Sequence, residues 1–359
     1  MTIYNFAAGP AILPAEVLQE AQRDLVSLPG VGLSLLEMSH RSKPVVEMID
    51  AAEADMRELA GIPDNYRVLF LQGGASLQFS MAPMNLLNPN GKADHIVTGN
   101  FANLALQDAQ KVGNVRVAGS TEDSNYDHVP SQDELDLDLD ADYVHITGNN
   151  TIYGTEWPTE PDTGNVPLVA DLSSNIFSKP IDITKYGLIY AGAQKNLGAA
   201  GVTMVIIRDD LVERSPDNLP GMLSYSVHAK GKSAYNTPPV FSIYILGLVV
   251  KWLSKQGGLE HMEQQNQDKA KLLYDQLDSS EFFSGHAAAG HRSPMNVTFR
   301  LPTAELETQF AGEAAAEGLV ELKGHRSVGG IRASIYNAFP KEGVEDLVAF
   351  MKEFERTNG

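Results

Sequence analysis

Two charged residues, Asp171 and Lys195, follow apolar segments that are typical of buried strands. Asp171 stands in LVADLSS within the segment 166–174, and Lys195 follows the segment 187–193 in the small-residue stretch AGAQKNLGAAG. In open α/β sheets, ligands bind beyond the carboxyl ends of the strands. Each residue alone has a simpler explanation: a turn or helix cap for Asp171, and a solvated side chain for Lys195. Together, at two successive strand ends, they favour one chemical site.

A lysine amine and a carboxylate in this arrangement are the pair that pyridoxal 5'-phosphate requires. The amine forms a Schiff base with the cofactor, and the carboxylate pairs with the pyridinium nitrogen. The stretch LQGGASLQF, residues 71–79, predicts a strand, a glycine turn and a helix. The N–H groups at that helix start and the hydroxyl of Ser76 would bind the cofactor phosphate. A tight turn without a ligand is the alternative for this stretch, which lacks the G-x-G-x-x-G pattern of dinucleotide sites.

The composition argues against several other classes of function. The chain has 359 residues, no cysteine and a net charge of 27 − 46 = −19. Such acidity repels nucleic acid and anionic membranes, so we expect neither as a partner. Without cysteine there are no disulfides and no thiolate metal sites, and we predict no bound metal. No apolar run is long enough for a transmembrane helix, and the start MTIYNFAAGP is unlike a secretory signal, so we expect a cytoplasmic enzyme.

Short apolar segments alternate with helical patterns through the first two thirds of the chain. This alternation predicts an α/β fold with a mostly parallel sheet that is covered on both faces. The last two predicted strands are too close for a helical crossover, so they should pair antiparallel. The predicted strands are 66–72, 93–99, 142–148, 166–174, 187–193 and 201–208, and the helices between them include 76–87 and 101–113.

After residue 240 the pattern changes to that of a smaller α+β unit. We predict two domains, a large one at 16–255 and a small one at 256–359 that includes the N-terminal arm 1–15. The elements predicted here are a long helical region at 240–278, strands at 295–301, 319–324 and 331–338, and helices near 303–317 and 342–356.

Several segments closely resemble the phosphoserine aminotransferase family, which belongs to the class V branch of the fold type I pyridoxal-phosphate enzymes. The resemblance runs from NFAAGPAILP to IYNAFP, which is nearly the whole chain. It implies the fold type I architecture, with a seven-stranded, mostly parallel sheet in the large domain and a smaller C-terminal α+β domain. The segments that carry it are YAGAQKNLGAAGVT, ADLSSNI, LQGGASLQF, NNTIYGTE, YNTPP and GHRSVGGIRASIYNA.

The resemblance also implies a reaction. This is the reversible ping-pong transamination of 3-phosphohydroxypyruvate with L-glutamate, giving O-phospho-L-serine and 2-oxoglutarate in serine biosynthesis. A related substrate of pyridoxine biosynthesis, 4-phosphohydroxythreonine, stays open as an additional one. The resemblance further implies a homodimer with its sites at the interface and one cofactor per subunit.

Site roles follow from the same resemblance, residue by residue. Lys195 would carry the Schiff base and then act as general acid and base, while Asp171 would keep the ring nitrogen protonated. Thr151 would bond the side of the ring that bears the phenolic oxygen. The phosphate would be held by Ala75, Ser76 and Gln194, with Asn236 and Thr237 from the neighbouring subunit.

Substrate binding is implied for basic residues that stand out in so acidic a chain. Arg332 would bind the α-carboxylate of the substrate, and Arg41, His325 and Arg326 the phosphate or the distal carboxylate, with His40 assisting. Guanidinium groups bind such anions bidentately. For each of the two His-Arg pairs taken alone, a surface turn with an ion pair is the simpler alternative.

At two positions the chain departs from the family pattern. Phe101 stands where the family commonly has a tryptophan stacked on the cofactor, so stacking should survive with less contact area. Ala8 stands where some members have a serine, so any contact there must use its backbone N–H.

Other readings stay open at this point. Among class V enzymes, a desulfurase lacks the cysteine it needs. A decarboxylase or a serine–glyoxylate type aminotransferase fits the basic residues less well. A regulatory aminotransferase-like domain would need a DNA-reading module, and a dehydrogenase would need the missing dinucleotide fingerprint.

Overall fold

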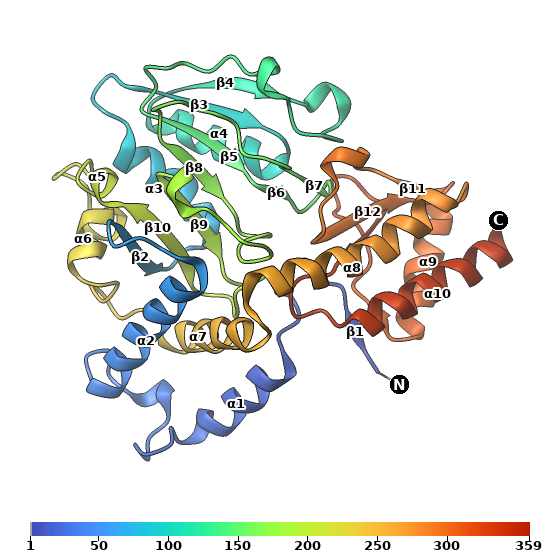
Figure 1. Ribbon diagram of the computed structural model, residues 1–359, viewed down its shortest axis with the longest axis horizontal. Helices are drawn as coiled ribbons and strands as arrows, with labels where there is room; N and C mark the ends of the chain where they lie inside the picture. Colours follow the sequence, from blue (N-terminus) through green and yellow to red (C-terminus); the bar gives the residue numbers. More distant parts are fainter. Residues whose placement is uncertain (1) are drawn as a thin grey trace.

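The computed structural model describes residues 2–359, and a seven-stranded sheet forms its centre (Figure 1). Neighbouring strands are parallel except on both sides of β10, so β10 runs against the other six. This confirms the predicted antiparallel pairing of 187–193 with 201–208. In spatial order the sheet contains β2 (Tyr66–Leu71), β10 (Thr203–Arg208), β9 (Leu188–Gly192), β8 (Leu168–Asp171), β5 (Tyr143–Thr147), β3 (Lys92–Val97) and β4 (Asn114–Ser120).

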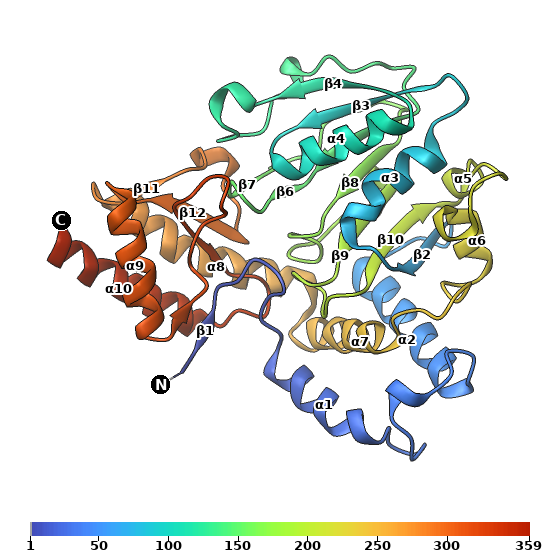
Figure 2. The same ribbon diagram turned by 180° about the vertical axis from the view of Figure 1, so that it is seen from behind.

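Helices cover both faces of this sheet, as predicted (Figures 1 and 2). Over the described residues, no helix is both long and apolar enough to pass through a bilayer. The helices of this part of the chain are α1 (Ala15–Val26), α2 (Lys43–Ala60), α3 (Gly74–Leu86), α4 (Asn100–Val112), α5 (Asp209–Val212), α6 (Tyr225–Lys230) and α7 (Val240–Lys255).

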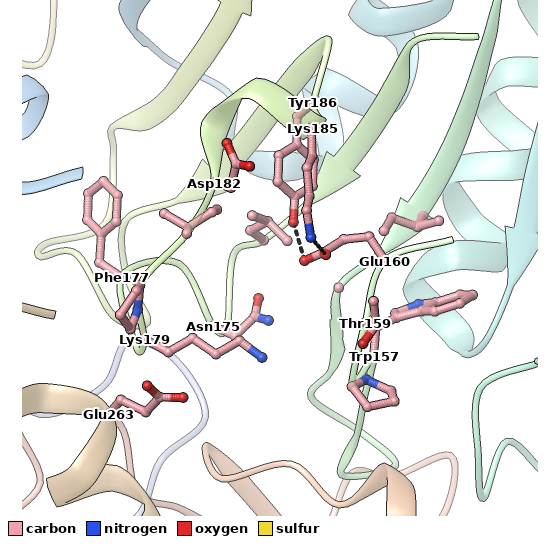
Figure 3. Close-up of a pocket in the computed structure, with 16 residues that line it drawn as sticks. Trp157, Thr159, Glu160, Asn175, Phe177, Lys179, Asp182, Lys185, Tyr186 and Glu263 are labelled. Atoms are coloured by element: carbon pink, nitrogen blue, oxygen red, sulfur yellow. Dashed lines mark hydrogen bonds and ion pairs between the residues drawn. The ribbon is translucent and has the colours of Figure 1, made fainter. Parts of the chain in front are cut away.

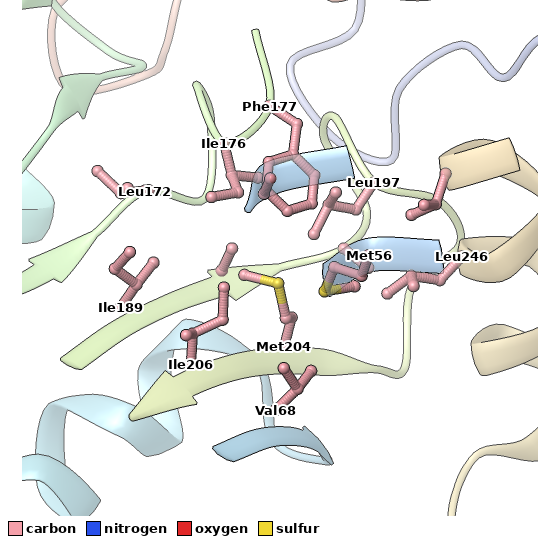
Figure 4. Packing of buried hydrophobic residues seen from close by; sticks show 14 of the residues in the cluster. Met56, Val68, Leu172, Ile176, Phe177, Ile189, Leu197, Met204, Ile206 and Leu246 are labelled. Atoms are coloured by element: carbon pink, nitrogen blue, oxygen red, sulfur yellow. The ribbon is translucent and has the colours of Figure 1, made fainter. Parts of the chain in front are cut away.

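Successive residues of one strand point to opposite faces, and each face has its own apolar core. Met204 and Ile206 of β10 pack on one face with Met56 of α2 and Leu246 of α7 (Figure 4). Residues of the opposite parity pack on the other face with α3 and α4. Because both faces are buried, the strands are nearly continuous apolar runs, which is why they were visible in the sequence.

The C-terminal third forms a separate apolar core with a three-stranded sheet. The first residues of the chain join this part, because β1 pairs with β13 and Phe6 is buried in the same core. Its elements are β1 (Tyr4–Asn5), α8 (Gly258–Ser279), β11 (Ser284–Gly285), β12 (Asn296–Arg300), α9 (Ala304–Ala316), β13 (Leu319–Val320), β14 (Ile331–Ser334) and α10 (Lys341–Asn358).

Three sequence-based predictions need correction. The helical region 240–278 is two helices, because Gly257 takes a left-handed conformation with a φ of 100° between α7 and α8. The segment 319–324 is a strand only at Leu319–Val320. Strand β4 was missed because polar residues such as Asn114 and Arg116 interrupt its apolar residues at the edge of the sheet.

A buried lysine fixes the chain where the small sheet meets the large one. Lys269 of α8 donates to the backbone carbonyls of Ile335, Tyr336 and Phe339 at 3.1, 2.7 and 3.2 Å. These carbonyls follow β14, the strand that carries Arg332. Burial lowers the pKa of Lys269 to about 7. The side chain therefore holds the turn after β14 by hydrogen bonds to neutral acceptors.

We expect Lys269→Met to destabilise the protein by roughly 2–5 kcal/mol, because it keeps the apolar stem and leaves three carbonyls without their donor. Urea unfolding of the purified protein measures the effect. Lys271→Met on the same helix is the control, since Lys271 is exposed and, among the described residues, pairs only with Asp275. Equal unfolding midpoints for the two variants would contradict the assignment.

Candidate active site

Asp171 and Lys195 leave the central sheet at the same edge. Asp171 is the last residue of β8, and Lys195 lies three residues after the end of β9, the neighbouring parallel strand. Asp171 is directly opposite Tyr190 in the register of the two strands. The sequence prediction that these two residues share one site therefore agrees with the geometry.

Lys195 is held from three sides. Its Nζ donates to Oγ1 of Thr151 at 2.7 Å and lies 5.2 Å from the centroid of the Phe101 ring. The N-terminal arm closes the third side, where a Cβ on Gly9 would come within 3.3 Å of Cγ of Lys195. Burial lowers the pKa of Lys195 to about 8; Asp171 acts to raise it and Arg332 to lower it further. A lysine in this state is a usable base and nucleophile near neutral pH.

The Asp171 carboxylate is buried, with only 5% of the residue exposed. Its Oδ1 accepts the backbone N–H of Ser173 at 2.9 Å. Within residues 2–359, no hydrogen bond reaches Oδ2 of Asp171, so this oxygen can take a donor from a ligand. Burial raises the pKa of Asp171, while the nearby Lys195 and the bonds from Ser173 oppose that rise.

A helix start without a side-chain cap faces the same edge of the sheet. Strand β2 is followed by Gly73 and Gly74, whose φ angles of 87° and 67° suit glycine, and α3 begins there. The first N–H groups of a helix have no partner inside the helix. Ala75 and Ser76 lie in this first turn, and Ser76 is exposed. The turn therefore offers hydrogen-bond donors to an anion, and binding of the cofactor phosphate by Ala75 and Ser76 stays a prediction.

These groups fit pyridoxal 5'-phosphate. A buried amine, a carboxylate with one oxygen available and a helix start without a cap match the aldehyde, the ring nitrogen and the phosphate of that cofactor. Phe101 supplies an aromatic face beside the lysine. No cluster of three or more metal-binding side chains occurs in residues 2–359.

Of the predicted substrate residues in the C-terminal part, Arg332 is the one that the structure places near the lysine. Arg332, on β14, is close enough to lower the pKa of Lys195. Arg332 and Arg326 also contribute to the lowered pKa of His325, behind the effect of burial, so these three basic residues lie near one another. The Nε of Arg332 is buried without a partner among the described residues, and burial lowers the pKa of its guanidinium.

His40 and Arg41 are not brought to Lys195 of the same chain. They lie between α1 and α2, in a segment that projects beyond α7 in Figures 1 and 2. His40 is buried and its Nε2 has no partner in the described structure, while Arg41 is exposed.

The remaining residues that were predicted to bind the phosphate lie near the turn before α3 and in the turn after β9. Gln72 donates to the carbonyl of Thr237 at 3.0 Å and accepts from Asn236 at 3.5 Å, which places both beside the turn before α3. Gln194 directly precedes Lys195, and its carbonyl accepts the N–H of Ala11 at 2.9 Å.

A belt of buried asparagines connects the lysine turn to the small sheet, and the sequence analysis missed it. Asn337 donates its backbone N–H to Oδ1 of Asn196, next to Lys195, at 3.0 Å. Asn266 of α8 donates to Oδ1 of Asn337 at 2.8 Å, and Asn149 donates to Oδ1 of Asn296 at 2.8 Å. Asn149, Asn196 and Asn337 lie in segments that carried the family resemblance, but no periodic pattern indicates that these buried amides bond to one another.

A buried aromatic layer lies on the Asp171 face of the sheet. His145 bonds the hydroxyl of Tyr190 at 2.7 Å and stacks on His95, with ring centroids 4.5 Å apart. Burial lowers the pKa of His145 to about 3, and the pKa of His95 also falls well below its usual value.

A cavity of about 280 Å³ lies on the other face of the sheet, and two ion pairs involve residues that line it (Figure 3). Glu160 pairs with Lys185 at 3.1 Å and accepts the hydroxyl of Tyr186 at 2.6 Å. Lys179 pairs with Glu156 at 2.6 Å. This cavity therefore adds nothing to the chemistry at Lys195.

Known proteins resemble this chain in sequence and in structure over its whole length. Residues 3–347 match the model of the family Aminotransferase class-V. A phosphoserine aminotransferase of Herpetosiphon aurantiacus is 54% identical over 100% of both chains. The structure of the enzyme of that name from Bacillus circulans subsp. alkalophilus superposes with a TM-score of 0.98 at 50% identity, over 99% of each chain.

A solved phosphoserine aminotransferase with bound pyridoxal phosphate, from Trichomonas vaginalis, has a TM-score of 0.93 at 38% identity and covers 98% of this chain and 99% of its own. The match extends from the N-terminal arm to the last helix. The chain therefore belongs to the class V aminotransferases, within the phosphoserine aminotransferase family, and is a pyridoxal-phosphate-dependent transaminase.

Proposed function

We propose that this chain transfers the amino group of L-glutamate to 3-phosphohydroxypyruvate, giving O-phospho-L-serine and 2-oxoglutarate, and that it serves serine biosynthesis. One observation carries the substrate class. In a protein of net charge −19, eight of the twelve arginines form ion pairs within residues 2–359 and four do not: Arg214, which donates to the carbonyl of Asp142, and the three residues that the resemblance assigns to substrate, Arg41, Arg326 and Arg332. Free guanidinium groups in so acidic a protein suit substrates that carry two or more negative groups.

The residues around Lys195 would hold the cofactor at several points. Bound pyridoxal phosphate supplies an electron sink for the negative charge that develops at the α-carbon of the substrate. Asp171 would bind its ring nitrogen and Lys195 its aldehyde carbon. The ring would lie against Phe101 and Thr151, and the phosphate at Ala75, Ser76 and Gln194, with Asn236 and Thr237 of the neighbouring subunit.

Lys195 moves the proton in this reaction. With a pKa of about 8, part of its Nζ population is neutral at physiological pH and can take the proton from the α-carbon of the substrate. The same Nζ would return this proton to the former aldehyde carbon of the cofactor, which lets the keto acid leave, and the second half of the reaction would reverse these two transfers. The hydroxyl of Thr151, 2.7 Å away, orients Nζ between these steps.

Arg332 would bind the α-carboxylate, which both substrates share. His325 and Arg326 would bind the second anionic group, which is a phosphate in one substrate and a carboxylate in the other. Because each product must leave before the next substrate enters the same site, one set of cations has to accept both anions. Guanidinium groups do so because their donor pairs match carboxylates and phosphates alike.

We propose that the enzyme is a homodimer in which His40 and Arg41 complete the site of the partner. Their distance from Lys195 of their own chain supports this. So do exposed apolar side chains on α1 and on the segment between α1 and α2, including Leu18, Val26, Leu33 and Leu36, which are 50–80% exposed.

We also propose that the chain consists of two domains, 16–255 and 256–359, with the arm 1–15 attached to the second. The separate C-terminal core that includes Phe6 supports this division. A cytoplasmic location is part of the proposal, because multiply charged substrates of this kind do not cross membranes unaided.

Arg332→Ala tests the proposed function. We expect kcat/KM for both glutamate and phosphoserine to fall about 100-fold, which corresponds to the roughly 3 kcal/mol of charge-assisted hydrogen bonds to the shared carboxylate. Coupled assays measure both, and the cofactor absorption band checks that the cofactor stays bound. A loss confined to phosphoserine would show that Arg332 binds phosphate instead.

The lowered pKa of Lys195 predicts a pH profile in the cofactor-free enzyme. Only the neutral amine reacts with acetic anhydride, so acetylation of Lys195 should rise with pH to a plateau with a midpoint near 8. Arg332→Gln removes a neighbouring positive charge and should move the midpoint upward. Mass spectrometry follows the reaction, with exposed Lys271 as the internal reference; a midpoint near 10.5 for Lys195 contradicts the prediction.

The dimer proposal predicts complementation. Arg41→Ala and Lys195→Ala homodimers should both be weakly active. A mixed dimer has one intact site if Arg41 serves the partner, because the Arg41→Ala chain keeps its own Lys195. We expect mixing and reassociation to restore up to about a quarter of the wild-type activity, since random pairing makes half of the dimers mixed. No recovery in isolated mixed dimers would place Arg41 in the site of its own chain.

A further inference from the structure

The turn that carries His325 and Arg326 is tied down by an ion pair with no role in the chemistry described so far. Arg300, at the end of β12, and Glu307, on α9, pair through Nε and Oε1 at 2.5 Å. Glu307 is almost fully buried, whereas the Arg300 side chain is about half exposed. Taken alone, an ion pair of this kind would only stabilise the small sheet.

Both members also bond to the turn, and they do so at one end of it. Nη1 of Arg300 donates to the carbonyl of Val328 at 2.8 Å, and Oε2 of Glu307 accepts the N–H of Gly330 at 3.1 Å. The two side chains thus bond the carbonyl of Val328 and the N–H of Gly330, two backbone groups that have no partner within the turn.

The turn is short and closed, so fixing this end places its tip. The N–H groups of Val328 and Gly329 both donate to the carbonyl of His325, at 2.9 and 2.8 Å. The N–H of Gly324 donates to the carbonyl of Gly330 at 2.8 Å, which closes the base. Any shift at Val328 is therefore passed to His325 and Arg326.

The backbone also lies too close to Arg300 for another residue type at the base. Gly330 has a φ of 72°, and a Cβ there would lie 2.7 Å from Cδ of Arg300 and 2.8 Å from the carbonyl of Phe299. Arg300 and Arg332 line the same cavity, of about 280 Å³, together with Val328 and Gly329. The ion pair therefore stands at the border of the proposed substrate space.

We propose that Arg300 and Glu307 are positioning residues for substrate binding, which set the place of the His325–Arg326 turn without touching substrate. The inference rests on the proposed function, because it assumes that the turn binds the second anionic group. The pair does not contact Lys195, so it should affect KM for doubly anionic substrates and leave the proton transfers nearly unchanged.

Arg300→Gln and Glu307→Gln test this with two readouts. We expect hydrogen–deuterium exchange of residues 324–331 to become at least about tenfold faster. KM for phosphoserine should rise at least about tenfold with kcat within about threefold of wild type. Arg300→Lys keeps the charge and one donor, and should recover part of both effects. Arg356→Gln is the matched control, because it breaks an exposed Arg–Glu pair on α10.

Two kinds of result would contradict this proposal or the proposed function on which it rests. An unchanged KM, or a fall in kcat together with faster exchange throughout the C-terminal part, overturns the positioning role and leaves a purely structural pair. Arg326→Ala separates this from a failure of the proposed function. If Arg326→Ala leaves KM for phosphoserine unchanged, the turn does not bind substrate, and the exchange data still decide whether the pair holds the turn.

Discussion

The placement of Asp171 and Lys195 at one edge of the sheet, close enough for the carboxylate to raise the pKa of the lysine, is the constraint on which the site depends. A buried charge costs several kcal/mol unless an opposite charge or hydrogen bonds compensate for it. The sheet provides this compensation because β8 and β9 are parallel neighbours, so both residues emerge at one edge. The reversed strand β10 then takes the chain back through the sheet soon after Lys195, which keeps the lysine turn short and the edge open.

The second constraint is that two apolar cores have to meet at a polar site. The asparagine belt solves it, since amide side chains donate and accept at once and leave no charge to desolvate. Asn196, Asn266 and Asn337 link the lysine turn, α8 and the end of the small sheet within hydrogen-bond distance. Lys269 performs the same task one turn further along α8, with carbonyls as acceptors.

The sequence was sufficient for those parts of the structure that follow a periodic pattern or a local motif. Six of the seven central strands were predicted, most of them from short runs rich in apolar residues, and Asp171 and Lys195 stand at or just after the ends of two of them. Strand β4 lies at the sheet edge and lacks such a run, and Gly257 interrupts a helical pattern by its backbone conformation alone. The asparagine belt and the contacts of Arg300 join residues that are far apart in the chain, so no local spacing of residues predicts these contacts. The location of Arg41, away from Lys195 of its own chain, likewise follows only from the fold.

The layer of His95, His145 and Tyr190 on the Asp171 face of the sheet has a further consequence. Histidines normally gain charge as the medium turns acidic, and this would change the potential at the neighbouring carboxylate. Here burial lowers the pKa of both imidazoles well below the usual value, so both resist gaining a proton. The layer is polar and fills this face of the sheet with hydrogen-bonded rings. Its charge nevertheless changes little with the pH of the surroundings. The electrostatic environment of Asp171 is left to the residues on its open side.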